Sequence, residues 1–263
     1  MIALSGMNGF LGKHLSKALS QMGQQVQSIP RELLYQPTEL IKFFNQHKPE
    51  IIYHLAAYGN MSNQTEESKI VYANIEATFN MLWASENIDY KKFVYISTSS
   101  VNLPVQTMYS ATKKAGELIA DIYRQRGKPI LTVRPYSLFG EGEAKFRFIP
   151  TVCNALLTGK EFDLDPTPMH DWIYVKHFIR ELLRSLGRED IIEIGSGHQT
   201  SNMVIVELLE EIAGKKANFR IVTKLRNYDT ENWRAEKLKR FSLQEGLKNT
   251  WEYYKYQYNL PYA

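Results

Sequence analysis

Short apolar runs alternate with longer amphipathic stretches along the first two thirds of the chain. Each run has the length of a buried strand, and each stretch between runs is long enough to form a helix. The expected strands cover residues 1–5, 25–29, 50–57, 92–97, 129–133 and 190–194, and the expected helices cover 13–22, 37–47, 71–86, 109–126, 149–157 and 175–186. This alternation is typical of a parallel sheet with helices on both faces. We therefore expect an α/β protein with a doubly wound parallel sheet.

The pattern loosens after Gly140, which indicates a smaller lobe at the C-terminal side. There Ser201 is expected to cap a helix and Gly214 to end it. The aromatic residues of 251–258 recur at roughly helical spacing, so we expect them to pack in the core or the lobe. A length of 263 residues suits one large α/β domain with such a lobe, and is too short for two full domains.

Composition excludes several classes of protein. The single cysteine, Cys153, excludes an internal disulfide framework and suits a reducing compartment. The chain opens on a strand, and no apolar run is long enough to cross a bilayer, so we expect a cytoplasmic protein without membrane partners. The scattered basic residues and net charge of +4 do not form the basic stripe typical of nucleic-acid binding. His170 and His177 have no neighbouring ligands at zinc-like spacing, so no metal is expected.

A glycine-rich turn, Gly6-Met-Asn-Gly-Phe-Leu-Gly12, lies between the first expected strand and the first expected helix. At this spacing one glycine permits the tight turn, one lets the backbone approach a pyrophosphate, and one lets the helix pack closely on the strand. The amides and the positive end of the helix then hold the phosphates. The alternative is an ordinary strand–helix turn. We predict a dinucleotide site, with cofactor contacts from Gly6, Asn8, Gly9, Phe10 and Leu11.

The end of the second expected strand bears on the choice of cofactor. Sites that prefer NAD usually have an acidic residue about 20 residues after the glycines. Here the strand ends in Val26-Gln-Ser-Ile-Pro-Arg31, without a carboxylate. Ser28 and Arg31 could accept the 2′-phosphate that a carboxylate would repel, so NADP is predicted ahead of NAD. The alternative is that Arg31 is a solvated turn residue.

A tyrosine and a lysine, Tyr109 and Lys113, are four residues apart at the start of an expected helix, so their side chains share one face. A phenol is a poor acid–base catalyst at neutral pH, but a nearby ammonium and an oxidised nicotinamide favour the phenolate. The hydroxyl run Ser97-Thr-Ser-Ser100 follows a strand and could hydrogen-bond the reacting oxygen. Serine and threonine also form ordinary turns after strands. Together with the glycine turn, the pattern favours catalysis.

These motifs resemble those of the extended short-chain dehydrogenase/reductase family, also called the NAD-dependent epimerase/dehydratase family. The resemblance covers nearly the whole chain. The matching segments, in order, are Gly6–Gly12, His54–Ala57, Asn74–Asn80, Val94–Ser99, Tyr109–Lys113, Val133–Gly140, Asp171–Val175, Ile194–Gly197 and Gly246–Thr250.

The resemblance implies a Rossmann-type sheet with a smaller C-terminal substrate lobe, and hydride transfer to or from the sugar of a nucleotide-sugar. Residues 1–140 and 172–197 would bind the cofactor, and 141–171 and 198–263 the substrate. Thr98, Tyr109 and Lys113 become the catalytic residues. Further cofactor contacts are implied for Leu55, Ala56, Ala57, Asn74, Pro135 and Tyr136, as well as for Tyr109 and Lys113. A homodimer through the helices near 74–86 and 109–126 is also implied.

Several positions depart from the family's pattern. Only ten residues separate Thr98 from Tyr109, His170 replaces an arginine, and Ser137 replaces an asparagine. The family's 4,6-dehydratases have an Asp-Glu pair where this chain has Ser99 and Ser100, so dehydration is not expected. A 4-ketosugar reductase is therefore expected first and a 4-epimerase with retained NAD second. A nonenzymatic NAD(P)-binding sensor is a remote third alternative, since a sensor has no need of the tyrosine–lysine pair.

Overall fold

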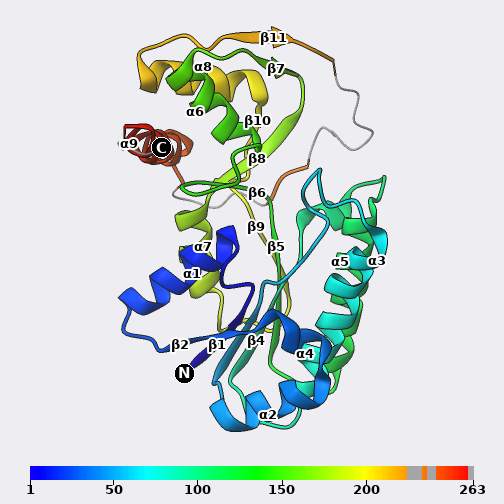
Figure 1. Ribbon diagram of the computed structural model, residues 1–263. Coiled ribbons are helices and arrows are strands. Elements are labelled where there is room, and N and C mark those ends of the chain that lie inside the picture. The colour runs from blue at the N-terminus through cyan, green and yellow to red at the C-terminus, as the bar shows by residue number, and fades with distance from the viewer. Residues whose placement is uncertain (224–232, 236–240, 260–263) are drawn as a thin grey trace. The chain divides into compact units, whose positions relative to one another are not determined.

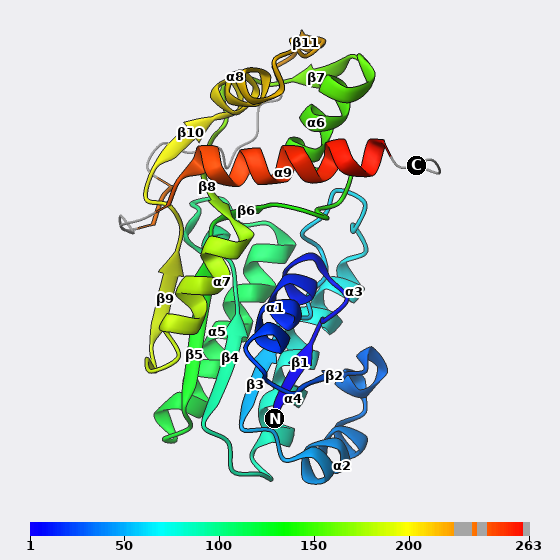
Figure 2. The same cartoon turned by 90° about the vertical axis from the view of Figure 1, so that its left-hand side faces the viewer.

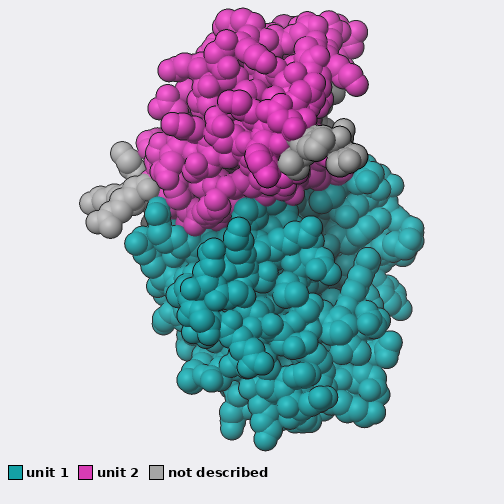
Figure 3. All heavy atoms as spheres, turned by 60° about the vertical axis from the view of Figure 1, so that its left-hand side comes forward, with its two compact units in different colours: residues 1–135, 179–193 teal, residues 136–178, 194–263 magenta. Residues whose placement is uncertain are grey.

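The computed structural model describes residues 1–223, 233–235 and 241–259, and the chain divides into two compact units (Figure 3). The first unit contains residues 1–135 and 179–193, and the second contains 136–178 and 194–263. The sequence-based division groups 136–140, 172–178 and 194–197 with the cofactor domain, whereas their contacts place them in the second unit. The reason is a separate three-stranded sheet, β10-β8-β6, formed by β6 (Ser137–Phe139), β8 (Met169–Tyr174) and β10 (Gln199–Ser201).

A six-stranded sheet forms the centre of the first unit, in the order β2-β1-β3-β4-β5-β9. Its strands are β1 (Ile2–Ser5), β2 (Val26–Ile29), β3 (Ile51–His54), β4 (Lys92–Ile96), β5 (Ile130–Pro135) and β9 (Ile191–Ile194). The pairs from β2 to β5 run parallel. From β1 the chain first adds β2 on one side and then adds β3 on the other side of β1. The strand order therefore reverses between β1 and β3, and ligands of such sheets bind at the carboxyl ends of the strands at this switch point.

Helices cover both faces of this sheet, which confirms the expected doubly wound architecture. α1 lies on one face, and α4 and α5 lie on the other (Figure 1). The helices of the first unit are α1 (Phe10–Gln21), the 3₁₀ turn η1 (Arg31–Tyr35), α2 (Pro37–His47), α3 (Glu67–Val71), the π-helical segment η2 (Tyr72–Glu76), α4 (Ala77–Ser85), the 3₁₀ turn η3 (Ser99–Asn102) and α5 (Met108–Gln125). α7 (Val175–Arg184) begins in the second unit and ends in the first.

Two expected elements differ from the observed ones for reasons seen in the hydrogen bonds. The strand expected over 50–57 ends at His54, because the amides of Leu55 and Ala56 donate to Ser5 Oγ. The helix expected over 71–86 begins four residues earlier and widens into the π turn at 72–76. There Thr78 Oγ1 donates to the carbonyl of Asn74 at 2.8 Å, so a side chain competes for that carbonyl. π turns of this kind often lie at functional sites.

In the described part of the second unit, helices pack with two small sheets. Its helices are α6 (Phe148–Thr158), α8 (Asn202–Ala213) and α9 (Leu243–Tyr258), and β7 (Phe162–Leu164) pairs in parallel with β11 (Phe219–Ile221). Figure 2 shows α9 along its length. Ser201 caps α8 by accepting from the Val204 amide, and Gly214 ends it at φ 64°, as expected. Cys153 is fully buried on α6. Within the described ranges, no helix is long and apolar enough to cross a membrane.

Candidate active site

The glycine turn after β1 is shaped for close approach of its neighbours. Gly6 has φ 72°, and a Cβ atom built on it would lie 2.8 Å from the Ala56 amide nitrogen. A Cβ on Gly12 would collide with the carbonyl of Gly6, so the helix packs directly on the turn. α1 begins at Gly9 with no side-chain cap and no acidic residue in its first turn. Its first amides can therefore donate hydrogen bonds to phosphate oxygens.

The predicted cofactor contacts of this turn are accessible. Asn8 and Gly9 are exposed, and Phe10 and Leu11 are half-buried. After β3, Leu55 and Ala56 are half-buried and Ala57 is exposed. Since Gly6 adjoins Ala56, the two segments lie side by side at the switch point of the sheet.

Ser5 and His54 form a buried polar node beneath these two segments. Ser5 Oγ lies 2.8 Å from His54 Nδ1 and accepts from the amides of Leu55 and Ala56 at 3.2 and 3.3 Å. Ser5 therefore donates its proton to Nδ1. On the other side of the ring, His54 Nε2 lies 3.1 Å from Thr78 Oγ1, whose proton is directed at the Asn74 carbonyl. His54 consequently carries its proton on Nε2.

Burial keeps the His54 ring neutral. Desolvation, and to a smaller extent the charge of Lys113, lowers the pKa of His54 to about 3. Because the imidazole is fully buried and neutral and both of its nitrogens are hydrogen-bonded, His54 connects β1, β3 and α4 and does not act as an acid–base group. The sequence motif that contains His54 did not reveal Ser5 and Thr78 as its hydrogen-bond partners. The one hint in the sequence was Ser5, a polar residue at the end of the apolar strand β1.

Asn74 continues this network toward α5. Its Oδ1 accepts from the Tyr58 amide at 3.0 Å, and its Nδ2 donates to the Tyr58 carbonyl and to Thr112 Oγ1 at 2.8 and 2.9 Å. Thr112 Oγ1 in turn lies within hydrogen-bond distance of the carbonyls of Met108 and Tyr109. Asn74 is fully buried and both of its N–H groups are used within the protein, so only Oδ1 keeps hydrogen-bonding capacity.

The predicted pair Tyr109 and Lys113 lies on α5, whose start is fixed by a capping box. Thr107 Oγ1 accepts from the Ser110 amide at 3.2 Å, and Ser110 Oγ accepts from the Thr107 amide at 2.8 Å. Tyr109 is half-buried one residue into the helix. The next turn of α5 places Lys113 on the same side of the helix.

Lys113 is the most unusual side chain of the site. It is 1% exposed, and its Nζ has no hydrogen-bond partner among the described residues. The ammonium lies 4.2 Å from the centre of the Tyr95 ring. Burial lowers the pKa of Lys113 to about 7, opposed by the Glu117 carboxylate. A buried ammonium with three unused donors can hold the hydroxyls of a ribose and stabilise a nearby phenolate.

Thr98 lies two residues after the end of β4 and caps η3, which packs against α5. Its Oγ1 accepts from the Ser100 amide at 3.2 Å and lies 2.9 Å from Ser100 Oγ. Thr98 is half-buried, so its hydroxyl remains accessible to a small molecule.

The remaining predicted cofactor residues are dispersed. Ser28 is half-buried near the end of β2, and Arg31 is exposed at the start of η1. The pKa of Lys69 is raised by its hydrogen bond and ion pair with Glu66, and the nearby charge of Arg31 opposes this rise. Pro135 ends β5 in the first unit, and Tyr136 is buried in the second.

A buried carboxylate, Asp171, organises the second unit. It accepts from the amides of Ser196, Gly197 and Ala235 and from Ser196 Oγ, at 2.6 to 3.0 Å. Beside it, the His170 ring packs edge-on against Trp172 and Trp233, with centroids 5.1 and 6.1 Å apart. His170, one of the departures from the family's pattern, therefore lies in an aromatic setting.

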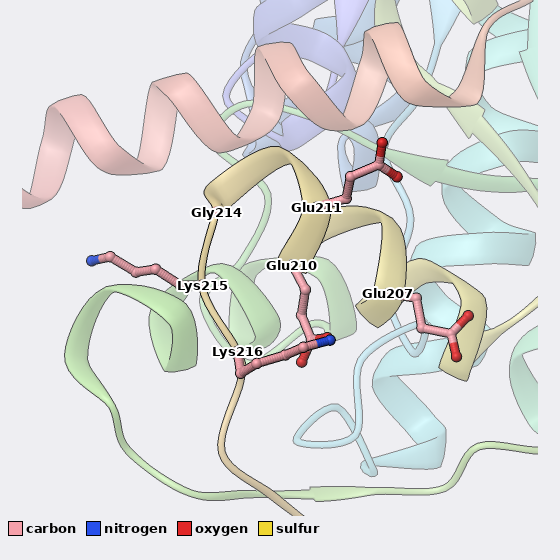
Figure 4. Close-up of a pocket in the computed structure, with 6 residues that line it drawn as sticks. All are labelled: Glu207, Glu210, Glu211, Gly214, Lys215 and Lys216. Carbon is pink, nitrogen blue, oxygen red and sulfur yellow. The ribbon is translucent and has the colours of Figure 1, made fainter.

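A hollow of about 330 Å³ lies at the C-terminal end of α8 in the second unit (Figure 4). Its lining residues are Glu207, Glu210, Glu211, Gly214, Lys215 and Lys216. Glu210 accepts from Lys216 Nζ at 2.5 Å and from the Ala217 amide at 2.9 Å. This charge pairing secures the turn after α8, and the hollow contains no predicted catalytic residue.

Comparisons with known proteins agree with this architecture. The model of the NAD dependent epimerase/dehydratase family matches residues 2–195. A UDP-glucuronate 4-epimerase of Thermodesulfobacterium geofontis is 30% identical over 238 residues, which cover 79% of this chain and 73% of the relative. An uncharacterized UDP-glucose epimerase of Bacillus subtilis is 26% identical over 229 residues, covering 76% of this chain and 72% of the relative.

Solved structures share the fold over almost the full length. A UDP-glucose 4-epimerase from Thermotoga maritima, with UDP-glucose, superposes with a TM-score of 0.85 at 21% identity, covering 97% of this chain and 99% of that one. A UDP-glucuronic acid 4-epimerase from Bacillus cereus, in complex with UDP-glucuronic acid and NAD, gives 0.82 at 23% identity and the same coverage. From the match of the family model over residues 2–195, the chain belongs to the NAD dependent epimerase/dehydratase family.

Proposed function

We propose that the chain transfers a hydride at C4 of a nucleotide-linked sugar, with Tyr109, Lys113 and Thr98 as catalytic residues. The observation that carries this proposal is the buried Lys113 ammonium, which has no hydrogen-bond partner among the described residues and lies one helical turn from Tyr109. Burying a charged donor without a partner is costly unless a bound molecule supplies acceptors. The ribose hydroxyls of a dinucleotide are acceptors of that kind.

Each catalytic residue has a separate task. The Tyr109 phenolate accepts the proton of the C4 hydroxyl as the hydride leaves C4, and it returns a proton when the reaction reverses. The Lys113 charge favours that phenolate and binds the cofactor ribose. Thr98 hydrogen-bonds the C4 oxygen. The nicotinamide supplies the hydride acceptor and donor.

We propose 4-epimerisation as the reaction, with reduction of a 4-ketosugar as the second candidate. The epimerase proposal is supported by the relatives, which include a UDP-glucuronate 4-epimerase at 30% identity. The sequence alone favoured the reductase because β2 ends without a carboxylate. That observation stands, since Arg31 is exposed beside the end of β2 and could contact a 2′-phosphate. We propose NAD for the epimerase and NADP for the reductase.

One experiment separates the two reactions. The protein is purified without added cofactor and denatured, and the released nucleotide is identified by chromatography. UDP-glucuronic acid and UDP-glucose are then incubated with the native protein, and the sugar products are separated. Stoichiometric NAD with interconversion of the 4-epimers supports the epimerase. Net NADPH oxidation on a 4-keto nucleotide-sugar, without retained NAD, supports the reductase instead.

We also propose a homodimer formed through α4 and α5. These two helices contact each other and the adjoining segment η2, and the three elements expose large apolar side chains, which we call the α4–α5 patch. The patch consists of Tyr72, Phe79, Trp83, Leu118 and Ile122, which are 54%, 45%, 40%, 64% and 47% exposed. Large exposed apolar side chains on neighbouring helices are typical of a protein interface.

A further inference from the structure

A second buried charge, Glu117, follows Lys113 by one turn on α5. It is 4% exposed and stands four residues after the lysine, so the two side chains share a face of the helix. A carboxylate at this spacing is the natural partner of a lysine. Among the residues that the structure describes, however, Lys113 and Glu117 form no ion pair, and Lys113 Nζ has no hydrogen bond.

Arg134, at the end of β5, holds the Glu117 carboxylate instead. Arg134 Nε donates to Glu117 Oε1 at 2.9 Å, and Nη2 donates to Oε2 at 2.7 Å. This two-pronged pairing occupies both carboxylate oxygens and fixes their plane. Arg134 is itself held from a third side, because Nη1 lies 3.2 Å from Asn102 Oδ1 and 3.4 Å from Glu193 Oε1.

We propose that Arg134 is a positioning residue that keeps Glu117 away from Lys113, so that the lysine ammonium stays available to the cofactor ribose. A lysine bound to Glu117 would spend its donors on the carboxylate. With Glu117 engaged by Arg134, the ammonium rests over the Tyr95 ring, a weak partner that a ribose hydroxyl can replace. Among the described residues, the titratable groups His54, Tyr95 and Glu193 also interact with members of this set, and Tyr109 interacts with Tyr95. This inference rests on the proposed role of Lys113.

The test uses three variants of the full chain and two readouts. Arg134→Met frees the Glu117 carboxylate, Glu117→Gln removes its charge, and the double variant removes both members of the pair. The first readout is NAD affinity by calorimetry after stripping bound nucleotide. The second is the titration of Lys113 followed by NMR of ¹³C-labelled lysine, with its signal identified as the one absent from Lys113→Met.

The proposal predicts opposite effects of the two single variants. Arg134→Met should raise the pKa of Lys113 and weaken NAD binding about 10-fold or more, because one charge-assisted hydrogen bond is lost. Glu117→Gln should lower the pKa of Lys113 and keep NAD affinity within about threefold. The double variant should behave like Glu117→Gln and so recover the affinity that Arg134→Met loses.

A purely structural ion pair would give a different result. Both single variants would then weaken NAD binding, and the double variant would not recover it, which would overturn the proposal. If Arg134→Met does not fold because it leaves a buried charge unpaired, Arg134→Lys replaces it, with a smaller shift in the same direction. A wild-type protein that binds neither NAD nor NADP would refute the proposed function, whereas the lysine titration would still test the arrangement of the three charges.

Discussion

Two buried nitrogen bases in the first unit, His54 and Lys113, differ in their hydrogen bonding. His54 has both ring nitrogens engaged by Ser5 and Thr78 and is neutral, so its contribution is rigidity. Lys113 has no hydrogen-bonded partner among the described residues, and the Tyr95 ring lies 4.2 Å from its ammonium. Both side chains are buried, so burial alone does not distinguish their roles. The difference in hydrogen bonding indicates that His54 stabilises the fold and that Lys113 is available to a ligand.

Tyr109→Phe should reduce kcat by about 10²- to 10⁴-fold, because it removes the group that exchanges the hydroxyl proton. Cofactor affinity should change little, since the ring remains. Turnover is measured on the nucleotide-sugar that the wild type converts, and NAD binding by calorimetry. Tyr256→Phe, on the exposed face of α9, is the control and should match the wild type. Wild-type turnover in Tyr109→Phe would refute the assignment.

Lys113→Met should raise the melting temperature of the cofactor-free protein more at pH 7 than at pH 10. The folded pKa, about 7, lies below the ordinary value of 10.5, so the unfolded chain binds more protons between these two pH values. Stability of the wild type therefore rises with pH across this window, and the variant lacks that rise. Lys114→Met, one residue along and exposed, is the control. Equal gains at both pH values would contradict the buried-charge explanation.

The helices and strands were predictable from sequence where residues within the same segment determine their bounds. They were less predictable where residues distant in the sequence determine the local structure. The expected helix at Ser201–Gly214 is confirmed, because cap and stop signals are local. The π turn at 72–76 escaped prediction because it depends on Thr78, Tyr58 and Thr112 meeting around Asn74 in three dimensions. For the same reason, the motifs located Tyr109 and Lys113 on α5, but could not show Arg134 holding Glu117.

Gly6→Ala should weaken NAD binding and lower stability by about 1–3 kcal/mol, the order expected for a strained backbone position. The new methyl group would press on the Ala56 amide across the switch point of the sheet. Gly23→Ala is a matched control, since Gly23 has φ 75° against 72° for Gly6, but no atom lies within 4 Å of the place its methyl group would take. Urea unfolding and calorimetry measure both effects. Similar losses of stability in Gly6→Ala and Gly23→Ala would mean that the positive φ of the backbone causes the destabilisation, and that the contact with Ala56 does not.

At the scale of the whole molecule, the proposed catalytic residues lie in one of the two units. The glycine turn, Thr98, Tyr109 and Lys113 all belong to the first unit, whereas His170 and the node around Asp171 belong to the second. His170 and Ser137, two of the positions at which this chain departs from the family's pattern, lie in the second unit. We expect the choice of sugar to depend on the second unit.

Leu118→Glu and Trp83→Glu should each convert a dimer into monomers, because they place a charge in the α4–α5 patch. Light scattering coupled to size-exclusion chromatography measures the mass directly. Met22→Glu is the control, since Met22 is 62% exposed at the end of α1 and lies outside the patch. A monomeric wild type, or a dimer that survives both changes, would refute the proposed interface.

The burial of the lone thiol has a practical consequence. Burial raises the pKa of Cys153 to about 12, so almost no reactive thiolate exists near neutral pH. Maleimide dyes should therefore not label the wild-type protein and should react only with cysteines introduced at the surface. Lys17→Cys on α1 and Lys255→Cys on α9, both at exposed positions in different units, would carry a donor and an acceptor fluorophore. Energy transfer between them would report in solution whether the two units approach each other when a nucleotide-sugar binds.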